Sequence, residues 1–265
     1  MSAFEPTGQR PLHPLDLGGI ANETIRLYRE HFLSLVAIVA IVQVIIAILV
    51  AIVVHLILHG NVVLGVIAGL VTGVLTLIGI EVQSGALTVS LADDYLGRPI
   101  TVQRALSAAV DRIGSLVGTS LLVGVLVGLM AITVIGIPFA IYFGIRWVFI
   151  AQVVMLENRA GTAAMQRSGQ LVQGFWWRTF GILLLVGIII GVISDILTLP
   201  FGQNVSGDIV RLVVQIILTP IAAAVATLLY FDMRVRKEDL THGVIAGSLP
   251  GSAGVGGVAP GPTTV

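Results

Sequence analysis

The sequence contains no cysteine, and charged residues of either sign are scarce. Without cysteine the chain has no disulfide, no thiolate metal ligand and no cysteine nucleophile. Charged residues make up 11% of the 265 positions and balance to a net charge of zero, which argues against nucleic acid as a partner. The chain also lacks a phosphate-binding loop, a dinucleotide fingerprint, a zinc-protease helix and a nucleophile elbow. We therefore predict no enzyme activity, no catalytic residue, no metal site and no cofactor.

Long apolar runs are what the chain has instead. Hydrophobic residues make up 56% of the sequence and the mean hydropathy is +1.03, so a soluble domain of this length would expose too much apolar surface. We expect an all-α membrane protein with six transmembrane helices. The first run is too long for the apolar core of a signal peptide, and no cleavage site of small residues follows it. The six spans are expected at residues 32–58, 62–90, 114–135, 138–156, 179–199 and 209–231.

Three amphipathic segments separate the apolar hairpins, and we expect each to form a cytoplasmic helix that lies on the membrane surface. They cover residues 15–31, 100–113 and 161–177. Each of them precedes a pair of spans, so the chain shows a threefold pattern of one short helix followed by one hairpin. A true internal repeat would give this pattern, and so would any hairpin protein with basic loops on one side of the membrane.

The basic residues of the loops fall almost entirely on one side of the expected spans. Arg211 alone lies in a loop on the other side, and Arg146 lies inside a span. Because Lys and Arg in short loops stay in the cytoplasm, we expect a multi-pass protein of the cell membrane (inner or plasma membrane) with both termini cytoplasmic. The chain then divides into a cytoplasmic N-terminal segment at 1–31, a six-span membrane domain at 32–231, and a mostly disordered cytoplasmic tail at 232–265.

Short polar and aromatic segments border the spans. They are PLDLG at 14–18, RLYR at 26–29, ADDYLGR at 92–98, RW at 146–147, LE at 156–157, WWR at 176–178 and YFDMR at 230–234. In this order they resemble the membrane domain found beside glycerophosphodiester phosphodiesterases and in related bacterial membrane proteins. The resemblance implies a fold and a membrane location. It carries no activity, because no segment here can host the catalytic histidine and metal-binding carboxylates of the soluble phosphodiesterase barrel.

Three charged residues lie inside expected spans: Glu81, Arg146 and Asp195. Charges in a membrane are costly and usually face the interior of the bundle or water. Glycines at four-residue spacing lead up to both acids, which predicts that the acids face other helices. Arg146 and Asp195 have similar expected depths, so we predict a buried ion pair that fixes the register of their helices. A substrate or proton site, and an arginine that extends unpaired to the membrane surface, are the alternatives. The glycines are Gly65, Gly69 and Gly73 before Glu81, and Gly187 and Gly191 before Asp195.

Five further residues lie where the short segments meet the spans, namely Arg29, Arg112, Trp176, Trp177 and Arg178. Tryptophan is enriched at membrane surfaces, and arginine clusters can bind anionic lipid headgroups. We interpret these residues as interfacial anchors, with headgroup binding as the alternative for the arginines.

The sequence as a whole favours a non-enzymatic integral membrane protein whose partners are the lipid bilayer and, as candidates, anionic headgroups or another membrane protein. Such a protein would act as a scaffold or accessory subunit. The alternative is a small transporter or lipid-handling protein with a polar intramembrane site around Arg146.

Overall fold

The computed structural model describes residues 14–60, 62–202 and 204–238, and their regular structure is all helical. Six helical segments are long and apolar enough to cross a membrane, which confirms the predicted fold class. These segments are Phe32–Leu58, Val63–Tyr95, Ile113–Ala131, Gly136–Glu157, Trp176–Phe201 and Val205–Lys237. The helices in chain order are α1 (Leu17–Glu30), α2 (Phe32–Leu58), α3 (Val62–Tyr95), α4 (Val102–Asp111), α5 (Ile113–Ala131), α6 (Gly136–Arg146), α7 (Ile150–Glu157), α8 (Gly161–Val172), α9 (Trp176–Thr198), the 3₁₀ turn η1 (Leu199–Phe201) and α10 (Val205–Lys237).

Three short helices, α1, α4 and α8, precede the three hairpins α2–α3, α5–α7 and α9–α10, in agreement with the predicted pattern. The first of them begins after Asp16, whose carboxylate accepts the backbone N–H of Gly19 at 2.6 Å and so caps the helix. The third ends at Val172, several residues before the expected end at 177. Gly174 has a φ of +85°, a conformation that suits glycine, and it turns the chain into α9.

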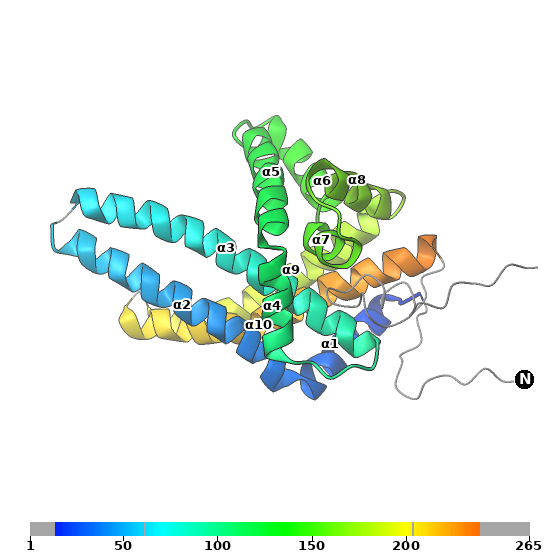
Figure 1. Ribbon diagram of the computed structural model, residues 1–265, viewed down its shortest axis with the longest axis horizontal. Helices are drawn as coiled ribbons and strands as arrows, with labels where there is room; N and C mark the ends of the chain where they lie inside the picture. Colours follow the sequence, from blue (N-terminus) through cyan, green and yellow to red (C-terminus); the bar gives the residue numbers. More distant parts are fainter. Residues whose placement is uncertain (1–13, 61, 203, 239–265) are drawn as a thin grey trace, which may run out of the picture.

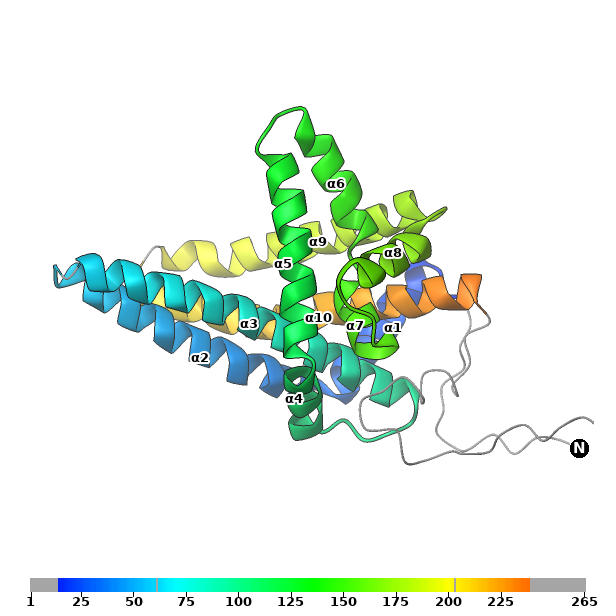
Figure 2. The ribbon, with the colours of Figure 1, turned by 45° about the horizontal axis from the view of Figure 1, so that its top comes forward.

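The three hairpins are joined at one end of the molecule, and the α5–α6 part of the second hairpin leaves it in a different direction from α2–α3 and α9–α10 (Figures 1 and 2). The joined end, which we call the base, consists of residues 15–39, 82–116, 149–182 and 224–238. Nearly all of the fully buried side chains belong to it, among them Leu27, Leu87, Phe149, Met155 and Tyr230. Away from the base, α2 and α3 run in one direction and α5 and α6 in another. Their outer halves therefore expose apolar side chains that suit lipid or another protein.

The helices of the first hairpin pack closely through glycines of α3. A methyl group added to Gly65 would lie 2.4 Å from Ile57, and one added to Gly79 would lie 2.9 Å from Ile46, so these two glycines let α2 approach. The glycines that lead up to Asp195 in the sequence have no such neighbour. Gly187 and Gly191 of α9 have no atom within 4 Å of an added methyl group, so this face of α9 is open in the chain that the structure describes.

The fourth span is interrupted, which the sequence analysis did not predict. Residues 147–149 form a turn between α6 and α7, where a continuous helix over 138–156 was expected. The chain compensates for the lost helical hydrogen bonds with Ser168 of α8, a fully buried residue. Its hydroxyl donates to the carbonyl of Arg146 at 2.9 Å and accepts the backbone N–H of Phe149 at 3.2 Å. One side chain from the third short helix therefore satisfies both ends of the break.

Replacing Ser168 by alanine is expected to lower the free energy of unfolding by about 1–3 kcal/mol, because a buried N–H and a buried carbonyl would lose their partner. The measurement is unfolding of the purified protein in detergent, followed by tryptophan fluorescence. Trp147 lies in the break itself, so the signal reports on this region.

The matched control is Ser107→Ala on α4. Ser107 is exposed and its hydroxyl donates only to the carbonyl of Arg104, at 3.0 Å. Its loss should change stability by about 0.5 kcal/mol or less. Equal stabilities of the two variants would show that Ser168 does not hold the break.

Candidate functional site

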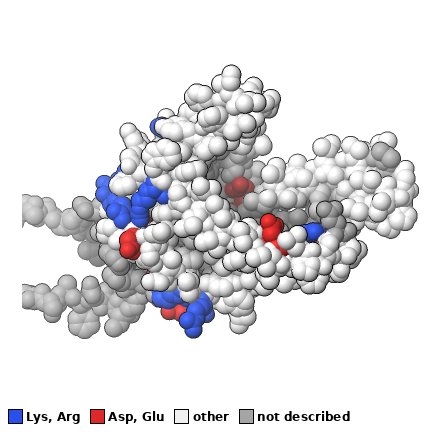
Figure 3. Space-filling view, turned by 180° about the vertical axis from the view of Figure 1, so that it is seen from behind, with Lys and Arg blue, Asp and Glu red and all other residues white. Residues whose placement is uncertain are grey.

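The most organised polar feature of the described chain is a layer of ion pairs at the base. Figure 3 shows blue and red side chains gathered at one end of the molecule, whereas the surface of the diverging hairpins is almost all white. Three buried acids organise this layer: Asp94 at the end of α3, Glu157 at the end of α7 and Asp232 near the end of α10. Their side chains are 5%, 9% and 0% exposed. Burial of a carboxylate requires compensating charge and hydrogen bonds, and each acid has both.

Each hairpin is closed at the base in a similar way, which we call a clasp. A basic residue just before or in the first turn of the hairpin's first helix binds the end of its last helix. In the first hairpin His31 Nε2 lies 2.7 Å from Asp94 Oδ1. In the second, Arg112 donates to the carbonyls of Val154 and Met155 at 2.8 and 3.0 Å. In the third, Arg178 Nη1 donates to Asp232 Oδ2 at 3.0 Å. The recurrence of the clasp supports a genuine threefold repeat over a chance pattern.

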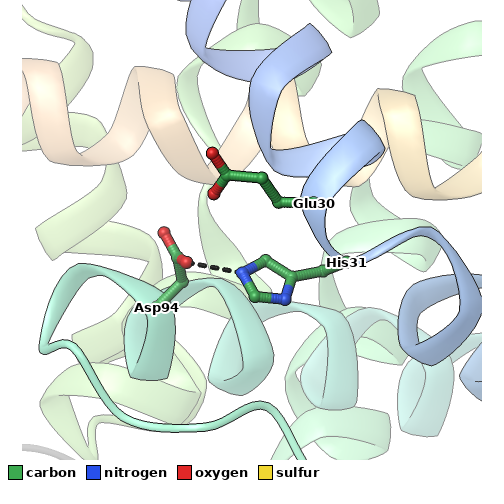
Figure 4. Close-up of side chains that lie close together, drawn as sticks. All are labelled: Glu30, His31 and Asp94. Atoms are coloured by element: carbon green, nitrogen blue, oxygen red, sulfur yellow. Dashed lines mark hydrogen bonds and ion pairs between the residues drawn. The ribbon is translucent and has the colours of Figure 1, made fainter.

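The first clasp joins α1, the start of α2 and the end of α3 (Figure 4). In addition to its contact with His31, the carboxylate of Asp94 forms an ion pair with the guanidinium of Arg26, with Nη2 and Oδ2 3.6 Å apart. Arg26 also donates to Glu30 at 2.6 Å and pairs with Glu23. Burial, the largest influence, lowers the pKa of Arg26, but the hydrogen bond and charge of Glu23 and the charges of Asp94 and Glu30 together raise it above its ordinary value. Arg26 is therefore always protonated and acts as the fixed cation of this cluster.

Glu30, His31 and Asp94 also have the composition of a metal site. One ligand atom from each lies within 4.8 Å of the others, and imidazole with carboxylates is a donor set that zinc accepts. The guanidinium of Arg26 already neutralises these carboxylates, however, and a divalent ion would have to enter against its charge. The geometry therefore supports an ion-pair clasp better than a metal centre.

The third clasp also holds the N-terminal segment. Asp232 accepts the backbone N–H of Leu15 at 2.8 Å, and its second cation is Arg236, with Nε at 2.9 Å. Arg178 and Arg236 both donate to the carbonyl of Leu15, at 2.6 and 2.8 Å. A fully buried carboxylate with one backbone donor and two guanidinium groups has the partners that its charged form requires. Residues more than two hundred positions apart are joined here by direct hydrogen bonds.

The end of the second hairpin belongs to a network around Glu157. Its carboxylate accepts from Arg167 Nε at 2.6 Å and from the hydroxyl of Tyr230 at 2.9 Å. Arg167 also pairs with Glu238. The hydrogen bonds that Arg167 donates to Glu238 and to Glu157 raise the pKa of Arg167, and the hydrogen bond that Glu238 accepts from Arg167 lowers the pKa of Glu238. Arg112, which binds only carbonyls here, has its pKa lowered by burial.

The structure corrects the predicted pair of Arg146 and Asp195. Trp176, the first residue of α9, donates its indole N–H to the carbonyl of Tyr142 at 3.1 Å, and Tyr142 lies one turn before Arg146. Arg146 is thus level with the start of α9. Asp195 lies more than five turns further along α9, about 28 Å away at the rise of an α-helix. Within residues 14–60, 62–202 and 204–238 no ion pair joins the two, and Asp195 is exposed.

Arg146 lies at the base side of the membrane, beside the break in the fourth span. Its guanidinium donates to the hydroxyl of Tyr142 at 3.4 Å and covers Gly169, where an added methyl group would approach Arg146 Nε to 2.8 Å. The residue is half-buried. Glu81 lies elsewhere, in α3, on the side that faces Ser120 of α5. The three predicted intramembrane charges therefore do not form one site.

Two of the five predicted interfacial residues face outward. Arg29 is exposed on α1, and Trp177 is 77% exposed at the start of α9. Arg112 and Arg178 instead bind the ends of helices, as described above, and Trp176 stacks on Phe180 with ring centroids 5.2 Å apart. Arg29 and Trp177 have the outward placement that an interfacial anchor or headgroup contact needs, and the interfacial role of all five residues stays a prediction.

The sequence analysis missed the role of Asp94, Glu157, Asp232 and Ser168. A signal was present for the acids, because each lies in the last turns of a hairpin and within one of the bordering segments at 92–98, 156–157 and 230–234. No comparable signal exists for Ser168, since serine is common in short amphipathic helices. Its partner is a break that the apolar pattern does not reveal.

The fold and the ion-paired base define a polytopic helical membrane protein. Comparisons of the chain with protein families, with curated proteins and with solved structures found no match. The resemblance to the membrane domain of glycerophosphodiester phosphodiesterases therefore remains a prediction that rests on the bordering segments alone.

Proposed function

We propose that the protein is a non-enzymatic scaffold of the cell membrane, with the base and both termini in the cytoplasm. The observation that carries the proposal is the contrast between the two ends of the molecule. The buried acids of the base are paired with basic residues, which makes a rigid platform, whereas the outer halves of the hairpins present apolar faces. A rigid platform with open apolar faces suits an accessory subunit that contacts lipid or other membrane helices.

The orientation rests on the basic residues. Arginines concentrate in the short helices and at the base, and Arg211 is the exception near the outer turn between α9 and α10. Positively charged loops stay in the cytoplasm. The exposed Arg29 on α1 would then face the anionic inner surface of the membrane, where each arginine contributes about 1 kcal/mol of attraction. The proposed fold family, that of the phosphodiesterase-associated membrane domain, is compatible with this arrangement.

A small transporter or lipid-handling protein is the second candidate, and one observation favours it. The fourth span is broken next to Arg146, and broken helices with a charged residue line substrate sites in many transporters. Arg146 is half-exposed, so a solute could reach it from the base. The distance to Asp195 speaks against a path lined by both residues.

Because the chain has no cysteine, single cysteines can separate the two candidates. We would introduce Leu77→Cys, Arg146→Cys, Gly191→Cys and Asp195→Cys and label each with a membrane-impermeant maleimide, in cells and in inverted vesicles. The scaffold predicts that no solute protects these positions and that Leu77→Cys stays unlabelled from either side. Labelling at several depths from one side, reduced by an added solute, would mean a conduit and would reject the scaffold.

The same reagent tests the orientation with two controls on the surface. Ser107→Cys lies at the base, and Val134→Cys lies in the turn between α5 and α6, where Val134 is 84% exposed. We expect only Val134→Cys to react in intact cells and only Ser107→Cys to react in inverted vesicles. The reverse result would place the base outside the cytoplasm.

A further inference from the structure

A groove lies between α2 and α10 in the halves of these helices that point away from the base. Both helices run outward from the base along this side of the molecule (Figure 1), and the groove between them has a volume of about 610 Å³. Its walls are aliphatic, with Ile46, Val50 and Val54 on α2 and Ile209 and Leu212 on α10. The groove is therefore an apolar channel along the surface of the membrane domain, separate from the ion pairs of the base.

On the α10 side, the length of the groove matches one leaflet of a bilayer. Its lining extends along α2 from Gln43 to Leu58, about 22 Å at the rise of an α-helix, and along α10 from Val205 to Gln215, about 15 Å. Half of a hydrocarbon core about 30 Å thick is about 15 Å. The amides of Gln43 and Gln215 end the apolar section on the side of the base. A hydrocarbon tail that enters at the outer end would fill the groove down to these amides.

The volume of the groove favours a hydrocarbon tail over a helix of another protein. A helix about 10–12 Å across would occupy about 2,000 Å³ over 22 Å of length. The groove offers about 610 Å³, which suits a thin occupant better than a whole helix. One acyl tail is thin and flexible enough to lie between α2 and α10.

The outer end of the groove carries one cation and one anion side by side. Arg211 donates to Asp208 Oδ1 at 2.8 Å and to the carbonyl of Gly202 at 3.0 Å. A guanidinium has five N–H donors, so donors remain for another acceptor. The side chains of Arg211 and Asp208 are 42% and 72% exposed, and both line the mouth of the groove. Such a pair is complementary to a headgroup that bears a phosphate and an ammonium group, and less so to a purely anionic one.

We propose that the groove binds a zwitterionic phospholipid with a primary ammonium group, of the phosphoethanolamine class, from the leaflet opposite the base. One acyl tail lies along Val50 and Ile209. The phosphate accepts from the free N–H groups of Arg211, and the ammonium donates to the carboxylate of Asp208. A quaternary ammonium would have no N–H to donate, so the site should prefer the primary amine.

The test uses the full chain in phosphatidylcholine vesicles that contain a small fraction of a photoreactive lipid. The two probes are phosphatidylethanolamine and phosphatidylglycerol with the same diazirine-labelled tail, and the labelled residues are mapped by peptide mass spectrometry. We expect the ethanolamine probe to label residues 43–58 and 205–215 above the other lipid-facing segments. Asp208→Asn should reduce its advantage over the glycerol probe by about tenfold, the loss expected for one charge-assisted hydrogen bond.

Ala47→Trp fills the groove and should abolish this labelling, since Ala47 is one of its lining residues. Ile45→Trp is the matched control, because Ile45 lies on the same helix, is 55% exposed and faces away from the groove. Asp208→Asn gives a test that does not depend on the folding of the tryptophan variant, because it keeps the size of the side chain and leaves the groove open. Labelling spread evenly over the lipid-facing helices and unchanged by Ala47→Trp would overturn the site. Labelling blocked by Ala47→Trp but equal for the two probes would overturn the headgroup assignment.

Discussion

Asp232→Asn is expected to lower the free energy of unfolding by about 3 kcal/mol, near the lower end of the range for breaking a buried ion pair. The asparagine keeps the shape of the side chain and leaves Arg178 and Arg236 beside a neutral amide. We choose the lower end because these two arginines retain 24% and 28% of their exposure and can recover some hydration. The measurement is equilibrium unfolding in mixed detergent micelles.

Asp208→Asn is the control on the same helix. Asp208 is 72% exposed, and exposed ion pairs contribute about 1 kcal/mol or less. The difference between the two variants isolates the effect of burial. If Asp232→Asn and the wild-type protein have the same free energy of unfolding, the third clasp does not stabilise the base, and the bond between Asp232 and the N-terminal segment contributes nothing to stability.

Phe149→Ala is expected to cost about 3–5 kcal/mol, the range for removing a large buried aromatic side chain. Phe149 is fully buried where the fourth span is broken, and its ring packs against Tyr230 with centroids 5.9 Å apart. The cavity would open between the break and α10. Thermal unfolding, monitored by size-exclusion chromatography, should therefore show a markedly lower midpoint temperature.

The fourth span offers a matched control in Phe139→Ala. Phe139 lies in α6 and is 56% exposed, so its removal changes lipid contact and creates no cavity. Phe149→Leu should fall between the two, because leucine fills part of the space. A similar loss in Phe139→Ala and Phe149→Ala would mean that the base is not the stabilising core of the molecule.

The number and the approximate positions of the spans could be read from the sequence because a helix in a membrane must be long and apolar, and few other features give runs such as 32–58. The three short helices could be read for a related reason. Each combines an apolar stripe with charged residues directly before a hairpin of spans, and α1 also has a capping aspartate in Asp16. These features depend on local composition, which the sequence contains in full.

The arrangement of the charges could not be read in the same way. Arg146 and Asp195 have similar depths only if the fourth span is one straight helix that crosses the whole membrane. The turn at 147–149 places α7 within the base and brings Arg146 to the level of Trp176. Ser168, which stabilises this turn, comes from a different unit of the chain. Contacts of this kind depend on tertiary structure, and the hydrophobic periodicity of the sequence does not predict them.

The clasps have a consequence for the order in which the protein is made. Each clasp joins residues of one hairpin, so each hairpin can close as soon as the ribosome has delivered its second helix to the membrane. The bonds between Leu15 and Asp232 are different, since Leu15 must wait for almost the whole chain to be translated. Until then the N-terminal segment has no partner at that position. Helix α10 therefore completes the binding of Leu15 long after Leu15 itself is synthesised, and a chain truncated before residue 232 would carry inserted units that are never locked to one another at this point.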